Sequence, residues 1–136
     1  MYEVFEHTAD LGLHVEAPTL EGLFAEAGRA LFSVIVEELD AVEPRTTREV
    51  RLEGPSEDYL LFDWLTELLY LFEREHLLFA RFEVRRDGDR LVGRASGEGV
   101  DPARHHLTHE VKAITYHGLF VEGGPAGFAA EVILDI

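Results

Sequence analysis

The sequence predicts an α+β domain in which mainly antiparallel β-sheets pack with two α-helices as a two-layer structure. Two segments repeat apolar residues at helical spacing, whereas several shorter segments alternate apolar with polar residues as half-buried strands do. The last third of the chain contains two strand-like segments with no helix between them. Helices that are segregated between runs of strands are typical of the α+β class.

The first third of the chain is expected to form two strands and a helix. Residues 2–5 are a short apolar strand, and residues 12–17 alternate apolar residues with polar or small ones. Pro18 ends this strand, and Thr19 is a suitable N-cap because its hydroxyl can accept a backbone N–H. The helix that follows should bury one face, formed by Leu20, Leu23, Phe24, Ala27, Leu31, Val34 and Ile35.

The middle of the chain predicts an edge strand and the more apolar of the two helices. Residues 42–52 hold Val50 and Leu52 among charged residues, which indicates an exposed or edge strand. Ser56 begins a second helix with a broad apolar stripe. Because wide stripes usually face a sheet, we favour core packing over a groove for a partner. The stripe consists of Leu60, Leu61, Trp64, Leu65, Leu68, Leu69 and Phe72.

Two pairs of strands are expected in the rest of the chain. Residues 78–86 and 90–96 flank a turn-rich insert, Asp87-Gly88-Asp89, and therefore predict a β-hairpin. Residues 110–121 and 128–136 are expected as two further strands, joined by the glycine- and proline-rich segment 123–127.

Composition narrows the classes of function. A chain of 136 residues with 46% hydrophobic content is expected to form one domain, residues 1–136. The absence of cysteine excludes disulfides, thiolate metal ligands and a cysteine nucleophile. No membrane-spanning run or signal peptide is recognisable, so we expect no membrane association and a cytoplasmic protein. The net charge of −15 opposes direct binding to a phosphate backbone, so any RNA is expected to be reached through a partner.

The C-terminal residues form the first candidate site. Apolar character continues to Leu134-Asp135-Ile136, so a side-chain carboxylate and the terminal α-carboxylate are one residue apart. Such carboxylates repel each other, and hard oxygen ligands suit Ca²⁺ or Mg²⁺. A third ligand would have to come from elsewhere in the chain. The alternative is that Ile136 only completes a core and that its carboxylate is solvated.

Three other clusters could carry chemistry. His7-Thr8-Ala9-Asp10 interrupts two strands, where a loop can hold ligands but where His and Asp also act as local caps. Residues 101–109 hold three imidazoles. His105 and His109 would share a face only on a helix, whereas a turn and a short exposed segment are favoured here, which disfavours a transition-metal site. These imidazoles are His105, His106 and His109.

The third cluster, residues 111–117, contains Lys112, the only lysine of the chain. A lone lysine among arginines indicates either a need for a compact ammonium or chance.

Together these motifs resemble the archease family over the whole length of the chain. The resemblance rests on His7-Thr8-Ala9-Asp10, on residues 63–70 (DWLTELLY), on residues 111–117 (VKAITYH) and on the terminal Leu134-Asp135-Ile136, in the same order. Archeases act with RtcB-type RNA ligases in tRNA splicing and RNA repair. The resemblance implies a protein cofactor, not an enzyme, that promotes guanylylation of the ligase and its multiple turnover.

The resemblance also implies roles for individual residues. Asp10, Asp135 and the terminal carboxylate of Ile136 match a divalent-cation site, usually described with Ca²⁺, with Mg²⁺ and Mn²⁺ as alternatives. Lys112 matches the functionally important lysine of the family. His7 lies beside the metal loop and could orient Asp10. No family role maps to the histidines of residues 105–109.

Two other classes of function stay open from the sequence alone. One is a metal-dependent hydrolase that uses Asp10 as ligand and His7 as base, with an activated water supplied by the metal. The other is a general chaperone or adaptor that presents the apolar second helix to partner chains.

Overall fold

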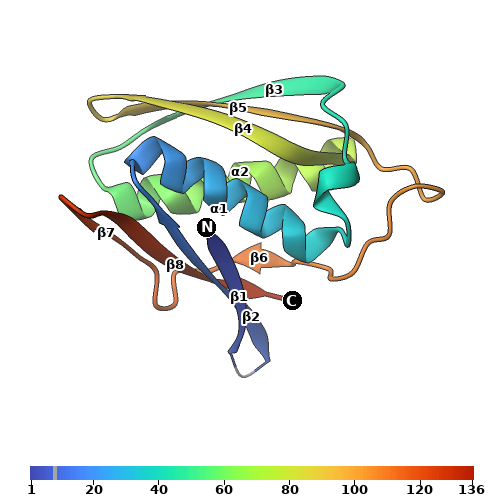
Figure 1. Ribbon diagram of the computed structural model, residues 1–136, viewed down its shortest axis with the longest axis horizontal. Helices are drawn as coiled ribbons and strands as arrows, with labels where there is room; N and C mark the ends of the chain where they lie inside the picture. The colour runs from blue at the N-terminus through green and yellow to red at the C-terminus, as the bar shows by residue number, and fades with distance from the viewer. Residues whose placement is uncertain (8) are drawn as a thin grey trace.

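The computed structural model describes residues 1–7 and 9–136 and places two helices between two antiparallel sheets (Figure 1). Thr8, a member of one candidate motif, lies outside the described residues. The elements are β1 (Tyr2–His7), β2 (Asp10–Ala17), α1 (Leu20–Ile35), the 3-10 turn η1 (Leu39–Ala41), β3 (Thr46–Glu53), α2 (Glu57–Glu75), β4 (Leu77–Asp87), β5 (Arg90–Gly99), β6 (Ala113–Ile114), β7 (Phe120–Gly124) and β8 (Gly127–Asp135).

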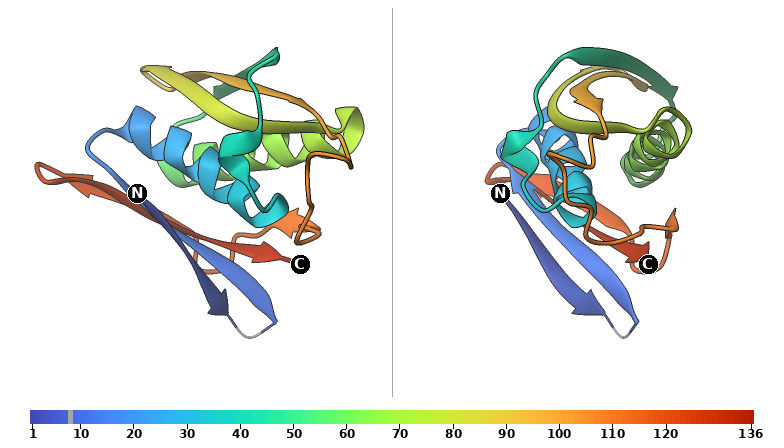
Figure 2. Two further views of the ribbon diagram at one scale, coloured as in Figure 1. Left: turned by 45° about the vertical axis from the view of Figure 1, so that its right-hand side comes forward. Right: turned by 90° about the vertical axis from the view of Figure 1, so that its right-hand side faces the viewer.

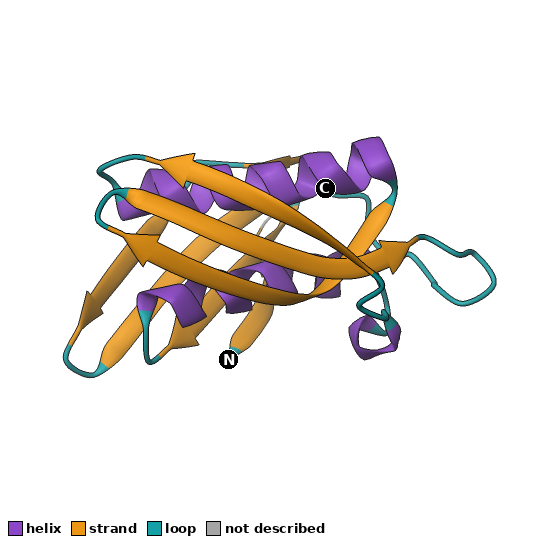
Figure 3. Ribbon diagram, turned by 90° about the horizontal axis from the view of Figure 1, so that it is seen from above, coloured by secondary structure: helices purple, strands orange, loops and turns teal. Residues whose placement is uncertain are grey.

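The two sheets have different sizes and face each other across the helices (Figures 1 and 3). The five-stranded sheet has the order β1-β2-β8-β6, and β7 also pairs with β8; the three-stranded sheet has the order β3-β5-β4. Every pairing is antiparallel. The α+β class with two helices is therefore confirmed. The expected two layers are corrected to three, because the helices contact both sheets.

The helices begin where their caps predict. The Thr19 hydroxyl accepts from the backbone N–H of Gly22 at 3.0 Å, and the Ser56 hydroxyl accepts from that of Tyr59 at 3.5 Å. Neither helix of the described chain is long and apolar enough to cross a membrane.

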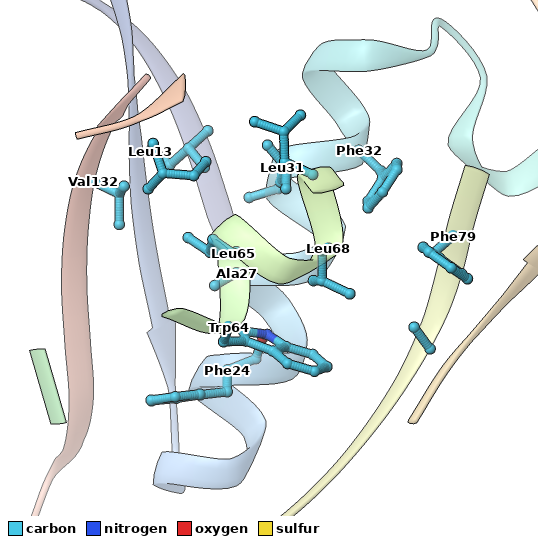
Figure 4. Packing of buried hydrophobic residues seen from close by; sticks show 14 of the residues in the cluster. Leu13, Phe24, Ala27, Leu31, Phe32, Trp64, Leu65, Leu68, Phe79 and Val132 are labelled. Carbon is cyan, nitrogen blue, oxygen red and sulfur yellow. The ribbon is translucent and has the colours of Figure 1, made fainter. Parts of the chain in front are cut away.

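The apolar stripe of α2 lies in the core between the sheets (Figure 4). Trp64 is fully buried, and its indole N–H donates to the carbonyl of Phe24 in α1 at 2.9 Å. Core packing is thus confirmed for the stripe, since six of its seven residues are buried and Phe72 is partly buried. The fully buried residues Leu60, Leu61, Trp64, Leu65 and Leu68 come from the predicted stripe.

Residues 110–121 do not form the single strand that the sequence predicts. The chain pairs with β8 only at β6 and again at β7, and it leaves the sheet in between. The ring of Tyr116 stacks on Phe62 of α2 with 3.8 Å between centroids, and Gly118 has a left-handed backbone (φ 66°). Contact with the helix and the turn at Gly118 together interrupt the strand.

Candidate functional site at the paired ends of β2 and β8

The register of β2 and β8 brings two distant aspartates together. The pairing runs from Ala17 opposite Phe128 to Leu11 opposite Leu134, so the next pair in the same register is Asp10 with Asp135. Buried Leu13 and Val132 belong to the side of the sheet that faces the helices. Because side chains alternate along a strand, Asp10 and Asp135 lie on the opposite, outward side. Directly opposed residues have Cβ atoms about 5 Å apart.

The neighbouring strands extend this row of residues. His7 of β1 is paired with Asp10, and Ala113 of β6 is paired with Asp135. The backbone N–H of Lys112 donates to the carbonyl of Asp135 at 2.7 Å, so the exposed Lys112 side chain begins beside the same residue. Three of the four motifs therefore meet at one end of the five-stranded sheet, which we call the β2–β8 corner.

The end of the chain is held at the β2–β8 corner. Figure 2 shows the C-terminus next to β6, and the partly buried side chain of Ile136 packs against the hydrophobic core. This packing fixes the residue that follows Asp135. The α-carboxylate of Ile136 belongs to the residue directly after Asp135.

His7 has a neighbour that the sequence did not assign. Its ring centroid lies 5.4 Å from that of His117, with the planes tilted by 56°. Its Nδ1 atom is buried and has no hydrogen-bond partner among the described residues. Within that part of the chain, this nitrogen therefore makes no hydrogen bond to Asp10, which His7 was expected to orient. The sequence signal for His117 was its membership of the segment that also carries Lys112.

The donors at the β2–β8 corner are oxygen atoms. In the described part of the chain, no three His, Asp or Glu side chains converge as a metal-ligand group. Asp10 and Asp135 supply only two side-chain carboxylates, and a third oxygen donor would be the α-carboxylate of Ile136, which is not a side chain. Carboxylate oxygens of this kind suit a hard divalent cation.

The histidine-rich segment 101–109 forms a different structure. His105 is only 5% exposed; its Nδ1 accepts from the backbone N–H of Asp101 at 2.9 Å, which leaves the proton on Nε2 for Glu98 at 3.1 Å. Arg104 donates to both carboxylate oxygens of Glu98, at 2.8 and 3.0 Å. The guanidinium of Arg104 is the main cause that lowers the pKa of Glu98 to about 2.

The other two imidazoles of this segment have separate surroundings. His106 is exposed, whereas His109 Nδ1 lies 3.3 Å from the carbonyl of Val34. Within the described residues, the three rings therefore do not converge as one group of metal ligands. Instead, hydrogen bonds hold this segment against β5, through Glu98, and against the end of α1, through Val34. The segment leads directly to Lys112.

Comparison with known proteins identifies the family of this fold. A model of the Archease protein family (MTH1598/TM1083) matches residues 2–136. The chain is 42% identical over 139 residues to the protein archease of Methanopyrus kandleri, covering 99% of both chains. It is 41% identical over 140 residues to that of Pyrococcus abyssi, covering 99% of this chain and 98% of the relative.

Solved structures agree with this result. The solution structure of Methanobacterium thermoautotrophicum protein 1598 superposes with a TM-score of 0.87 at 35% identity, over 99% of this chain and 98% of the other. The crystal structure of a Thermotoga maritima archease, described as a possible chaperone, has a TM-score of 0.67 at 20% identity and shows the same fold. The full-length family match and these relatives show that the chain belongs to the archease family.

Proposed function

We propose that this chain activates an RtcB-type RNA ligase by promoting its guanylylation and multiple turnover, and that it performs no ligation itself. Membership of the archease family supports this function. The observation that supports it is the β2–β8 register, whose continuation past Leu11 and Leu134 sets Asp10 opposite Asp135, together with the backbone hydrogen bond from Lys112 to Asp135. Residues from three of the motifs therefore lie near one another at the β2–β8 corner, where we infer that a partner makes contact.

A divalent cation at the β2–β8 corner is the second part of the proposal. Asp10, Asp135 and the α-carboxylate of Ile136 would hold it, with Ca²⁺ as the first candidate and Mg²⁺ or Mn²⁺ as alternatives. When bound, the ion supplies the positive charge that offsets repulsion among the carboxylates. The chain's own residues hold the end of β8 against β2, and the exposed Lys112 ammonium has no hydrogen-bond or ion-pair partner among the described residues and is open to contact by a partner.

The two other classes of function have less support. A hydrolase needs a base at the metal, and the buried Nδ1 of His7 makes no hydrogen bond to Asp10 within the described residues. A chaperone that presents α2 would need its apolar stripe at the surface, yet six of the seven stripe residues are buried and Phe72 is partly buried. The purified chain can be tested with a cognate ligase for guanylylation, with generic phosphoesters for hydrolysis and with unfolded proteins for suppression of aggregation.

Replacing Asp10 by asparagine tests the cation site directly. We expect calorimetry to show at least a tenfold loss of Ca²⁺ affinity, because one of three charged ligands becomes neutral. Appending residues after Ile136 should weaken binding as well, since a peptide bond removes the α-carboxylate charge. Asp89→Asn in the exposed β4–β5 turn makes the same chemical change elsewhere and should bind as the parent does. Parent-like Ca²⁺ binding by Asp10→Asn refutes the assignment of Asp10.

A further inference from the structure

Both sheets present one face away from the helices (Figures 1 and 3). The two faces differ in the charged residues that they carry. On the three-stranded sheet, opposite charges alternate across the strands. The register places arginines of β5 between carboxylates of β3 and β4: Arg94 between Glu49 and Glu83, and Arg90 between Glu53 and Asp87. This face therefore neutralises much of its own charge.

The outward face of the five-stranded sheet lacks such compensation. We call it the acidic face; its charged residues are Glu3, Asp10, Glu16, Glu122, Glu131 and Asp135. None of the outward-facing residues in these described strands is arginine or lysine.

His14 lies between two carboxylates of this face. Its Nδ1 lies 2.9 Å from a carboxylate oxygen of Glu131, and its Nε2 lies 3.0 Å from one of Glu16. These hydrogen bonds raise the pKa of His14. The nearby amino group of Met1 is turned to Glu26 of α1 at 3.0 Å. Glu3 and Glu122 are exposed and receive no such partner among the described residues.

The acidic face is hollowed at the end remote from the β2–β8 corner. A groove of about 690 Å³ lies between β2 and the β7–β8 hairpin. Ala126, Ala129 and Gly123 are among its lining residues, and Glu16 and Glu122 supply exposed carboxylates to it. Small apolar residues next to two carboxylates suit the long aliphatic stem and cationic head of arginine or lysine.

We propose that the acidic face docks a basic protein segment, with an arginine or lysine side chain of that segment in the groove between Glu16 and Glu122. Charge complementarity selects this occupant, because a nucleic-acid backbone is repelled by the same carboxylates. The face also carries the Asp10–Asp135 row, so a partner that lies along it reaches the β2–β8 corner. Only the identification of this partner as the ligase rests on the proposed function.

A pair of matched double variants tests this docking surface. Glu3→Gln with Glu122→Gln removes two charges from the acidic face, whereas Glu49→Gln with Glu83→Gln removes two from the opposite sheet. Both change the net charge equally, so general attraction to a basic probe is the same. The probe is a fluorescent hexa-arginine peptide, whose affinity is measured by anisotropy in low salt and again in high salt, with a single-stranded RNA hexamer in a parallel series.

We expect the acidic-face variant to bind the peptide about fivefold more weakly in low salt, with a smaller dependence on salt. The opposite-face variant should bind within about twofold of the parent, and the RNA hexamer should not bind. Equal losses in both variants, no loss in either, or tighter binding of RNA than of peptide would overturn the proposal.

The same variants are then compared in ligase activation as a function of chain concentration. A higher half-maximal concentration for the acidic-face variant alone supports docking of the ligase on this face. If the parent does not activate the ligase, the proposed function fails while the peptide result still decides the docking surface. If the parent activates and the peptide series shows no difference between variants, the docking surface alone is refuted.

Discussion

Glu98 shows how one buried carboxylate can hold a loop in place. It accepts hydrogen bonds from Arg104, from His105 and from the backbone N–H of Glu43, and so links residues 43, 98 and 104–105. Because these donors hold its pKa at about 2, below the ordinary value of 4.5, Glu98 stabilises the fold fully only above about pH 4.5. That stabilisation is lost as the pH falls from about 4.5 towards about 2.

Glu98→Gln should therefore lower the free energy of unfolding by roughly 3 kcal/mol near neutral pH. The difference in free energy of unfolding between parent and variant should narrow steadily as the pH is lowered from about 5 to about 3. Over this range the parent loses the stabilisation by the ionised Glu98 carboxylate, which the variant lacks at every pH. Urea unfolding at several pH values measures this. A difference that stays constant over that range would show that Glu98 acts through packing and not through its charge. The buried role of Glu98 had no signal in the sequence, since it depends on an arginine and an imidazole from the following loop.

At the scale of elements, β4 and β5 depend on the absence of a side chain at one position. Gly97 of β5 lies opposite Phe79, beside the irregularity in pairing between Phe79 and Arg81. A Cβ at Gly97 would lie 1.7 Å from the carbonyl oxygen of Leu78. Real atoms cannot approach so closely, so the backbone would have to shift and the ladder would be distorted.

We predict that Gly97→Ala destabilises the protein by about 3 kcal/mol or more in urea unfolding. Gly124→Ala at the end of β7 is the matched control, because a Cβ there meets nothing within 4 Å. The control should be neutral or stabilising by up to about 1 kcal/mol. Similar stabilities for the two variants would show that the strands can adjust at Gly97.

The elements that could be predicted from the sequence are those defined by local chemistry. Both helices begin at their polar caps, and the β4–β5 hairpin turns at the Asp-Gly-Asp insert, where Gly88 has φ 63°. The division of residues 110–121 was not predicted, because it depends on stacking of Tyr116 on a helix distant in sequence as well as on the turn at Gly118. The third layer was missed for a similar reason, since α1 and α2 each bury residues against both sheets.

At the scale of the whole molecule, the facing ends of β1 and β2 meet the end of β8 at a single corner. The sequence identified Asp135 and Ile136 as a pair of carboxylates that needs a third ligand, and the resemblance to archeases supplied Asp10. Neither the terminal carboxylates nor the resemblance predicts the β2–β8 strand register, whose continuation makes Asp10 and Asp135 neighbours. Charge is also distributed unevenly, because the surplus of acidic residues is uncompensated on one sheet and balanced by arginine on the other.

The measurement that tests ligase activation most directly is the number of ligations that each cognate ligase molecule completes with and without this chain. The parent should support many ligations per ligase molecule. Lys112→Ala should lose this effect, and Lys112→Arg should lose much of it, because a planar guanidinium does not reproduce the compact ammonium. Arg85→Ala on the opposite sheet, confirmed like the others to be folded by thermal melting, should match the parent. Equal turnover with and without the parent chain would contradict the proposed function, and full activity of both Lys112 variants would remove Lys112 from the site.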